Sequence, residues 1–89
     1  MPSGLPKTLN ELKLQIAGQH QGLSKRLRQV AQYLVDNPNQ IAFGTVATIA
    51  ADAGVHPSTL VRFANAFGFS GFSEMQRLFQ HQLLQESPS

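Results

Sequence analysis

The 89-residue chain has no cysteine, few charged residues and no long apolar run. Without cysteine, neither a disulfide framework nor a thiolate metal site can form. No apolar stretch approaches the roughly 20 residues that a membrane-spanning helix needs. The chain starts with MPSGLPKTLN, which lacks the charged and apolar regions of a signal peptide. We therefore expect a soluble, cytoplasmic protein without a membrane partner.

Side chains suited to catalysis or metal binding are scarce and scattered. His20, His56 and His81 have no metal-ligand partner three or four residues further along the chain, so we expect no metal site. Ser58 and Thr59 lie near His56, but no third group is placed to orient the imidazole. The acidic residues form no evident catalytic pair, and the pattern predicts no strand that a phosphate loop would follow. We expect neither enzyme activity nor a cofactor.

Residues 46–67, VATIAADAGVHPSTLVRFANAF, predict two short amphipathic helices joined by a sharp turn. Apolar residues recur at i, i+3, i+4 and i+7 in each helix, namely Val46, Ile49, Ala50 and Ala53, then Leu60, Phe63, Ala64 and Phe67. Gly54 stands where the first helix needs a residue with positive φ, and Pro57 stands where the second tolerates a missing N–H. A plain αα-hairpin has the same features, but the pattern favours a helix-turn-helix whose second helix fits the major groove of DNA.

The outward face of the second helix is suited to a polyanion. It carries hydroxyls, an amide and a guanidinium but no carboxylate, on His56, Ser58, Thr59, Val61, Arg62 and Asn65. Arg62 can bind guanine with two parallel hydrogen bonds, or it can pair with Asp52 on the preceding helix. Ser58 and Thr59 stand at the helix start, where N–H groups can hold a phosphate. With Pro57 and the expected helix cap Thr45, these residues are candidates for DNA binding.

Positive charge is concentrated in the first third of the chain. The net charge is only +2, but Lys7, Lys13, Lys25, Arg26 and Arg28 face a single acidic residue, Glu11, in this part. Lys25, Arg26 and Arg28 fall in the first turn of a predicted helix, where cations oppose the helix dipole. We expect these three residues to flank the recognition helix and contact phosphates, the alternative being a solvated basic face.

The remaining pattern predicts an all-α bundle of about five helices without a clear wing. Thr8 and Ser24 are expected to cap the first two helices, with Glu11 completing a capping box at Thr8. The expected apolar stripes are Leu9, Leu12 and Ile16, then Leu27, Val30, Ala31 and Leu34. The second helix should stop at Asn37-Pro38. Residues 38–44 then form a short connector from which Ile41 and Phe43 enter the core.

The last predicted helix starts at Ser70 or Gly71 and carries a wide apolar face. Its stripe is Phe72, Met75, Phe79 and Leu83, widened by Leu78 and Leu84. The preceding FGFSGF segment should lock this helix onto the bundle, rather than stack exposed bases, because it holds no basic residue. The width of the face suggests contact with another domain or a second copy. We expect a homodimer paired through the first or the last helix, and a protein-interaction module without DNA binding remains the alternative function.

Several segments together resemble the N-terminal helix-turn-helix domain of the RpiR family of bacterial transcriptional regulators. They are LSKRLRQVAQYLVDNP, AADAGV, STLVRF and GFSGFSEMQ, and the similarity covers residues 23–78. The positions that carry it are Gly54, Val55, Thr59, Arg62, Phe63, Gly68, Phe69, Gly71, Phe72 and Glu74. His56 departs from the Ser or Thr usual before the recognition helix, and Asn65-Ala66 stand where basic residues are frequent.

The resemblance implies sequence-specific binding of double-stranded DNA by one half of a larger regulator of sugar metabolism. In such regulators a C-terminal sugar isomerase (SIS) domain binds a phosphosugar effector. On this basis we expect a flexible tail at residues 1–7, the DNA-binding domain at residues 8–85, and the start of a linker to the absent SIS domain at residues 86–89.

Overall fold

A computed structural model describes residues 6–86, and this part of the chain is all-α, without strands. Six α-helices and one 3₁₀ turn follow one another: α1 (Leu9–Gln19), η1 (His20–Gly22), α2 (Lys25–Asp36), α3 (Pro38–Phe43), α4 (Val46–Ala53), α5 (Pro57–Ala66) and α6 (Phe72–Glu86). Most of the tail expected at residues 1–7 and of the linker expected at residues 86–89 lies outside the described residues.

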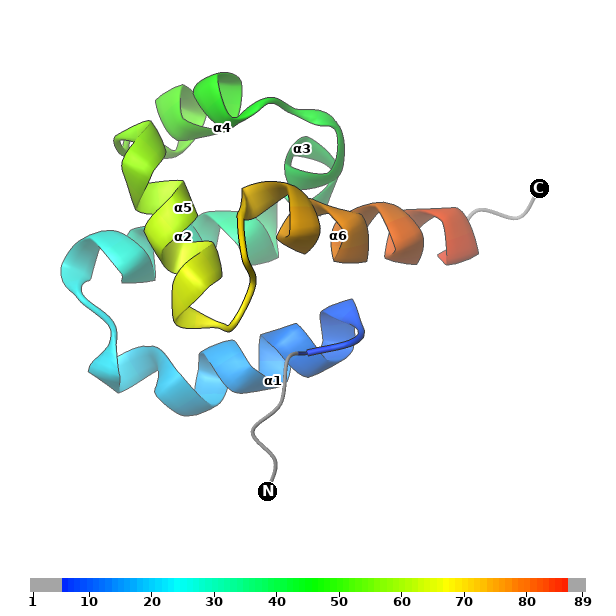
Figure 1. Ribbon diagram of the computed structural model, residues 1–89, viewed down its shortest axis with the longest axis horizontal. Coiled ribbons are helices and arrows are strands. Elements are labelled where there is room, and N and C mark those ends of the chain that lie inside the picture. The colour runs from blue at the N-terminus through cyan, green and yellow to red at the C-terminus, as the bar shows by residue number, and fades with distance from the viewer. Residues whose placement is uncertain (1–5, 87–89) are drawn as a thin grey trace.

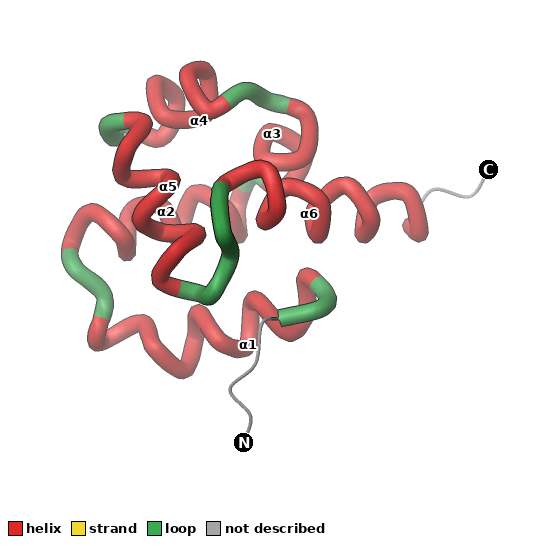
Figure 2. The backbone as a smooth tube through the Cα atoms, viewed as in Figure 1, coloured by secondary structure: helices red, strands yellow, loops and turns green. Residues whose placement is uncertain are grey.

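The helices surround one core, with α5 packed between α2, α4 and α6 (Figure 1). In this view α4 and α5 lie at the upper left, α1 lies along the lower edge, and α6 runs past α3 toward the right. The connections are short, as the green segments of Figure 2 show. The turn between α4 and α5 lies at the upper left of the molecule, away from α1 and from the C-terminal end of α6.

Side-chain hydroxyls cap the N-terminal ends of three of the helices, as the sequence predicts. The Oγ1 of Thr8 accepts from the N–H of Glu11 at 3.1 Å, and Ser24 and Thr45 make the equivalent bonds at the starts of α2 and α4. Thr45 completes a capping box with Thr48. The Glu11 carboxylate instead accepts from the backbone N–H of Lys7, one residue before the expected partner. These bonds satisfy N–H groups that the first helical turn leaves without a partner.

The core consists almost entirely of the predicted apolar stripes. Its buried members are Leu9, Leu12, Ile16, Leu23, Val30, Ala31, Leu34, Ile41, Ala42, Ile49, Ala50, Leu60, Phe63, Ala64, Phe67, Phe69, Phe72, Met75 and Phe79. The rings of Phe63 and Phe67 are 4.9 Å apart and tilted by 44°. Because Phe67, Phe69 and Phe72 are all buried, the FGFSGF segment anchors α6 to the bundle and offers no ring for base stacking.

The prediction of a connector at residues 38–44 is wrong, since residues Pro38–Phe43 form helix α3. The described part of the chain therefore has six α-helices. Pro38 occupies the first helical position, where its fixed φ favours a helix. Gln76 and Gln80 of α6 donate to carbonyls at the other end of α3 at 2.8–3.0 Å. Tertiary hydrogen bonds therefore complete a helix too short to be stable alone.

Phe43 does not enter the core as expected; its side chain is 72% exposed, whereas Ile41 is fully buried. Each residue of an α-helix turns the side chain by about 100°, so a residue two positions after a buried one faces roughly the opposite way. The last helix also begins at Phe72, slightly later than predicted. Ser70 precedes it and donates from its N–H and hydroxyl to the Glu74 carboxylate.

Replacing Phe63 by alanine should lower the free energy of unfolding by about 3–5 kcal/mol, because the ring is fully buried and would leave a cavity. Phe43→Ala truncates a ring that is mostly in solvent, and should alter the free energy of unfolding by less than about 0.5 kcal/mol. Urea unfolding followed by circular dichroism measures both. Equal losses in the two variants would contradict the assignment of Phe63 to the core.

Candidate nucleic-acid interface

The turn between α4 and α5 closes through backbone hydrogen bonds around a left-handed glycine. Gly54 has φ 75° and donates to the carbonyl of Ala51 at 3.3 Å, while Val55 donates to the carbonyl of Ala50 at 3.0 Å. This pair of bonds is the Schellman arrangement, in which a residue without a Cβ takes the left-handed position. The half-buried Val55 packs against the core. The turn thus fixes where α5 begins.

The side chain of His56 caps the start of α5. Its Nδ1 accepts from the backbone N–H of Ser58 at 3.5 Å and lies 3.2 Å from the Ser58 hydroxyl, and Pro57 takes the first helical position. An accepting Nδ1 assigns the ring proton to Nε2 in the neutral imidazole. His56 therefore replaces the usual hydroxyl as the cap.

One face of α5 is exposed and free of carboxylates, as the sequence predicts. Ser58, Val61, Arg62 and Asn65 are all exposed and follow the spacing i, i+3, i+4 and i+7, opposite the buried stripe of the same helix. Thr59 is half-buried at the edge of this face. The result is a single stripe of a hydroxyl, an aliphatic group, a guanidinium and an amide.

A groove beside the turn lies between α2 and the start of α5. It is lined by Arg26, Ala50, Ala51, Gly54, Val55, His56, Pro57 and Thr59. Of the three expected phosphate contacts, Arg26 therefore lies next to the start of α5. Arg28 stands about 200° around α2 from Arg26, and its Nε donates to the carbonyl of Leu23 at 3.2 Å. Lys25 is exposed at the first residue of α2.

Thr45 lies at the other end of α4 from the turn. Its side-chain oxygen is occupied in the capping box with Thr48, and the side chain is exposed. Its distance from the turn is the length of α4, which is about 12 Å for eight residues. Thr45 is therefore separated from the candidate surface at the start of α5.

Two side chains of α2 that the sequence reading overlooked hold the end of α4. Gln29 Nε2 donates to the carbonyls of Ala53 and Gly54 at 2.8 and 3.3 Å. The Tyr33 hydroxyl donates to Asp52 Oδ2 at 2.6 Å. Asp52 is thus bound to Tyr33, and within the described residues 6–86 it forms no ion pair with Arg62. The sequence pattern that could have indicated them is the spacing i, i+3 and i+7 of Arg26, Gln29 and Tyr33, which places the three side chains on one face of α2.

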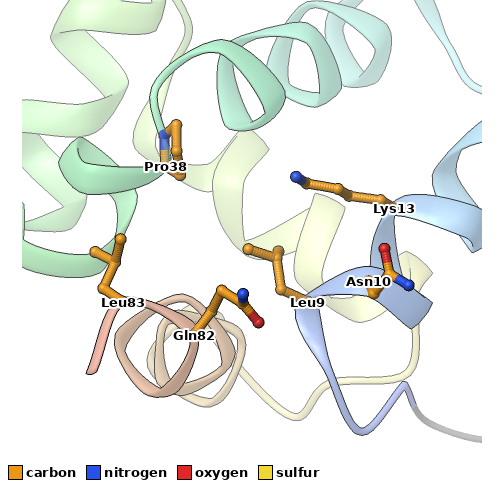
Figure 3. A pocket seen from close by; sticks show the side chains of 6 residues that line it. All are labelled: Leu9, Asn10, Lys13, Pro38, Gln82 and Leu83. Carbon is orange, nitrogen blue, oxygen red and sulfur yellow. The ribbon is translucent and has the colours of Figure 1, made fainter. Parts of the chain in front are cut away.

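A separate hollow of about 160 Å³ lies between α1 and α6 (Figure 3). Its walls are Leu9, Asn10, Lys13, Pro38, Gln82 and Leu83. Leu14 on α1 and Leu84 on α6 are 68% and 74% exposed. By contrast, Phe72, Met75 and Phe79 of the wide α6 stripe are buried in the domain's own core.

The part of the chain that the structure describes contains no group of three His, Asp or Glu side chains able to hold a metal ion. None of its helices has the length and the apolar content needed to cross a membrane.

Two side chains have shifted pKa values that follow from their contacts. Burial raises the pKa of the Tyr33 phenol to about 12, and the hydrogen bond to Asp52 and the charge of that carboxylate add to the effect. The hydrogen bonds from the backbone and the hydroxyl of Ser70 lower the pKa of Glu74, and the nearby charge of Arg77 contributes. Tyr33 therefore stays a neutral donor to Asp52 at physiological pH.

The Tyr33 contact should make folding stability fall at alkaline pH. Because the pKa of Tyr33 is higher in the folded chain, the unfolded chain loses its phenolic proton first, from about pH 10 upward. The stabilisation is complete below this value and should be lost progressively as the pH rises to about 12. Tyr33→Phe should lack this stabilisation. Urea unfolding between about pH 10 and 12 should therefore show the free energies of unfolding of the wild type and the variant converging. Parallel pH profiles would refute the contact.

Comparison with known proteins identifies relatives over most of the chain. The family described as "Helix-turn-helix domain, rpiR family" matches residues 10–86. The chain is 34% identical over 68 residues to the HTH-type transcriptional regulator HexR of Pseudomonas aeruginosa, covering 76% of this chain and 24% of that protein. It is 32% identical over 78 residues to the uncharacterized HTH-type transcriptional regulator YfhH of Escherichia coli, covering 85% of this chain and 28% of that protein.

The chain spans about a quarter of the length of these curated relatives. No solved structure matches it.

Proposed function

The chain belongs to the rpiR family of helix-turn-helix domains, and from this premise we propose that it binds duplex DNA sequence-specifically by inserting α5 into the major groove. The observation that carries the proposal is the exposed, carboxylate-free stripe of Ser58, Val61, Arg62 and Asn65. It lies on the helix whose first residues line the groove that Arg26 borders. A helix presented in this way matches the width of the major groove.

The stripe offers chemistry for reading bases. Arg62 has no ion pair within the described residues 6–86, so its guanidinium is free to bind O6 and N7 of a guanine. Val61 is 40% exposed, which suits contact with a thymine methyl group. Asn65, one turn beyond Val61, carries an amide that can bind adenine at N6 and N7. These three side chains are the proposed source of specificity.

Positioning on the duplex is assigned to groups that contact phosphates. Ser58 and Thr59 stand at the start of α5, where their hydroxyls are proposed to bind a phosphate, and Arg26 borders the groove that Thr59 lines. Lys25, Arg28 and Thr45 are proposed to add contacts further along the backbone, and His56 and Pro57 shape the entry of the helix. Such contacts fix register without reading sequence.

A selection from random duplexes tests the function directly. The 89-residue chain should enrich a defined sequence, and the enriched duplex should shift mobility at lower protein concentration than the random pool. A chain that shifts neither duplex would favour the alternative, a helical protein-interaction module that uses the exposed Leu14 and Leu84.

Arg62→Ala should cost about 1–3 kcal/mol of discrimination at one base position while leaving the melting temperature nearly unchanged. The reason is that Arg62 is exposed and its side chain makes no hydrogen bond or ion pair within the described residues 6–86. Arg77→Ala is the matched control, because Arg77 is an exposed arginine on α6. Competition between enriched and random duplexes measures the ratio of affinities. If Arg62→Ala unfolds the domain, or weakens binding to both duplexes by the same factor, Arg62 does not read bases.

Neutralising a phosphate contact should weaken binding to all sequences and reduce the log–log salt slope by about 0.9. Arg26→Gln is expected to do so, because Arg26 lies at the groove beside the start of α5. Lys25→Gln and Arg28→Gln test the rest of the cluster in the same salt titration. A wild-type slope in all three variants would reduce the cluster to a solvated basic face.

The finer biological role is also a proposal. We infer from the resemblance to RpiR regulators that this DNA-binding domain operates in the cytoplasm within a regulator of sugar metabolism, joined to a SIS domain that binds a phosphosugar. A homodimer is proposed because one such domain offers few contacts, whereas a two-fold pair reads two half-sites. No enzyme activity or cofactor is proposed for the chain.

A further inference from the structure

The side chain of Gln29 completes the end of α4 at the turn. The N–H groups of Gly54 and Val55 already bond to carbonyls in the last turn of α4. These bonds do not involve the carbonyls of Ala53 and Gly54, and Gln29 Nε2 donates to both of them. A side-chain amide nitrogen has two N–H groups, so a single Gln29 side chain can serve both carbonyls.

Gln29 belongs to a polar stripe on α2 that touches both helices of the helix-turn-helix. Arg26, Gln29 and Tyr33 share one face of α2 at i, i+3 and i+7. Tyr33 binds Asp52 in the last turn of α4, and Arg26 borders the groove at the start of α5. The stripe therefore spans the turn from the end of one helix to the beginning of the next.

These contacts differ in kind from the apolar packing beneath them. Gln29 and Asp52 are exposed, so water can replace either hydrogen bond at small cost in stability. Burial of apolar surface is non-directional, whereas a hydrogen bond is satisfied only over a narrow range of distance and angle. The stripe thus sets the orientation of the turn relative to α2 more than it stabilises the fold.

We propose that Gln29, assisted by Tyr33, is a positioning residue for DNA binding: it holds the α4–α5 turn against α2 so that Arg26 and the outward face of α5 meet the same duplex. This inference rests on the proposed function. Gln29 acts through the turn and does not itself need to touch DNA.

Gln29→Met tests the role, since it keeps the length of the side chain and removes both donors. Gln32→Met is the matched control: it makes the same change on the same helix, where Gln32 Nε2 donates to Asp36 within α2. Binding of the 89-residue chain to a fluorescein-labelled random-sequence duplex is measured by anisotropy over a range of salt concentrations. Circular dichroism gives the melting temperature of each variant.

The log–log salt slope of Gln29→Met should fall by about 0.9, as in Arg26→Gln, because a displaced turn separates Arg26 from its phosphate. The variant that combines Arg26→Gln with Gln29→Met should show no further fall in the salt slope, since both changes remove the same phosphate contact. Gln32→Met should keep the wild-type slope. The melting temperature of Gln29→Met should drop by less than about 8 °C.

A merely structural role would lower the folded fraction and weaken binding equally at every salt concentration, leaving the slope unchanged. An unchanged slope in Gln29→Met, or additive slope losses in the double variant, would overturn the proposal while leaving DNA binding intact. If Gln29→Met does not fold, Tyr33→Phe, which removes a single hydroxyl, decides the question by the same slope. A wild-type chain that binds no duplex would overturn the proposed function, and this inference with it.

Discussion

Burial of the inward stripe of α5 is the interaction on which the rest of the structure depends. Leu60, Phe63 and Ala64 are fully buried against α2, α4 and α6. Because an α-helix has a fixed period, burying this stripe also fixes which residues face outward. The carboxylate-free face of Ser58, Val61, Arg62 and Asn65 is therefore a consequence of core packing. Folding and the proposed recognition of DNA use opposite sides of one ten-residue helix.

Apolar packing alone would leave the angles between these short helices loosely defined. The structure adds side-chain amides that bind the ends of helices: Gln29 reaches the end of α4, while Gln76 and Gln80 reach the end of α3. Each amide satisfies carbonyls that a helix end leaves without a partner. The two helices that precede α5 are thereby held from different sides, by α2 and by α6. Directional bonds thus complement a core that is itself non-directional.

The positions of individual charged side chains say more about the candidate DNA-binding surface than the net charge of the chain does. A net charge of +2 is too small to suggest nucleic acid by itself. What matters is that the outward face of α5 carries no carboxylate, and that Asp52, the acidic residue nearest the turn in sequence, lies on α4 and is hydrogen-bonded to Tyr33 of α2. Arg26 meanwhile borders the groove at the start of α5, next to a capping imidazole. The surface offered to a polyanion is therefore locally favourable although the chain as a whole is nearly neutral.

The sequence by itself determined the features that depend on local geometry. The helical period identified the buried stripes and the outward face of α5, the hydroxyls of Thr8, Ser24 and Thr45 predicted caps, and Gly54 predicted a left-handed turn. Each depends on residues within one or two helical turns. Only the tertiary structure decided that Pro38–Phe43 is a helix, that Phe43 faces solvent, and that Arg26 lies at the turn while Arg28 bonds to Leu23. It likewise decided the roles of Gln29 and Tyr33, since these follow from contacts between residues about 20 positions apart, which no local pattern encodes.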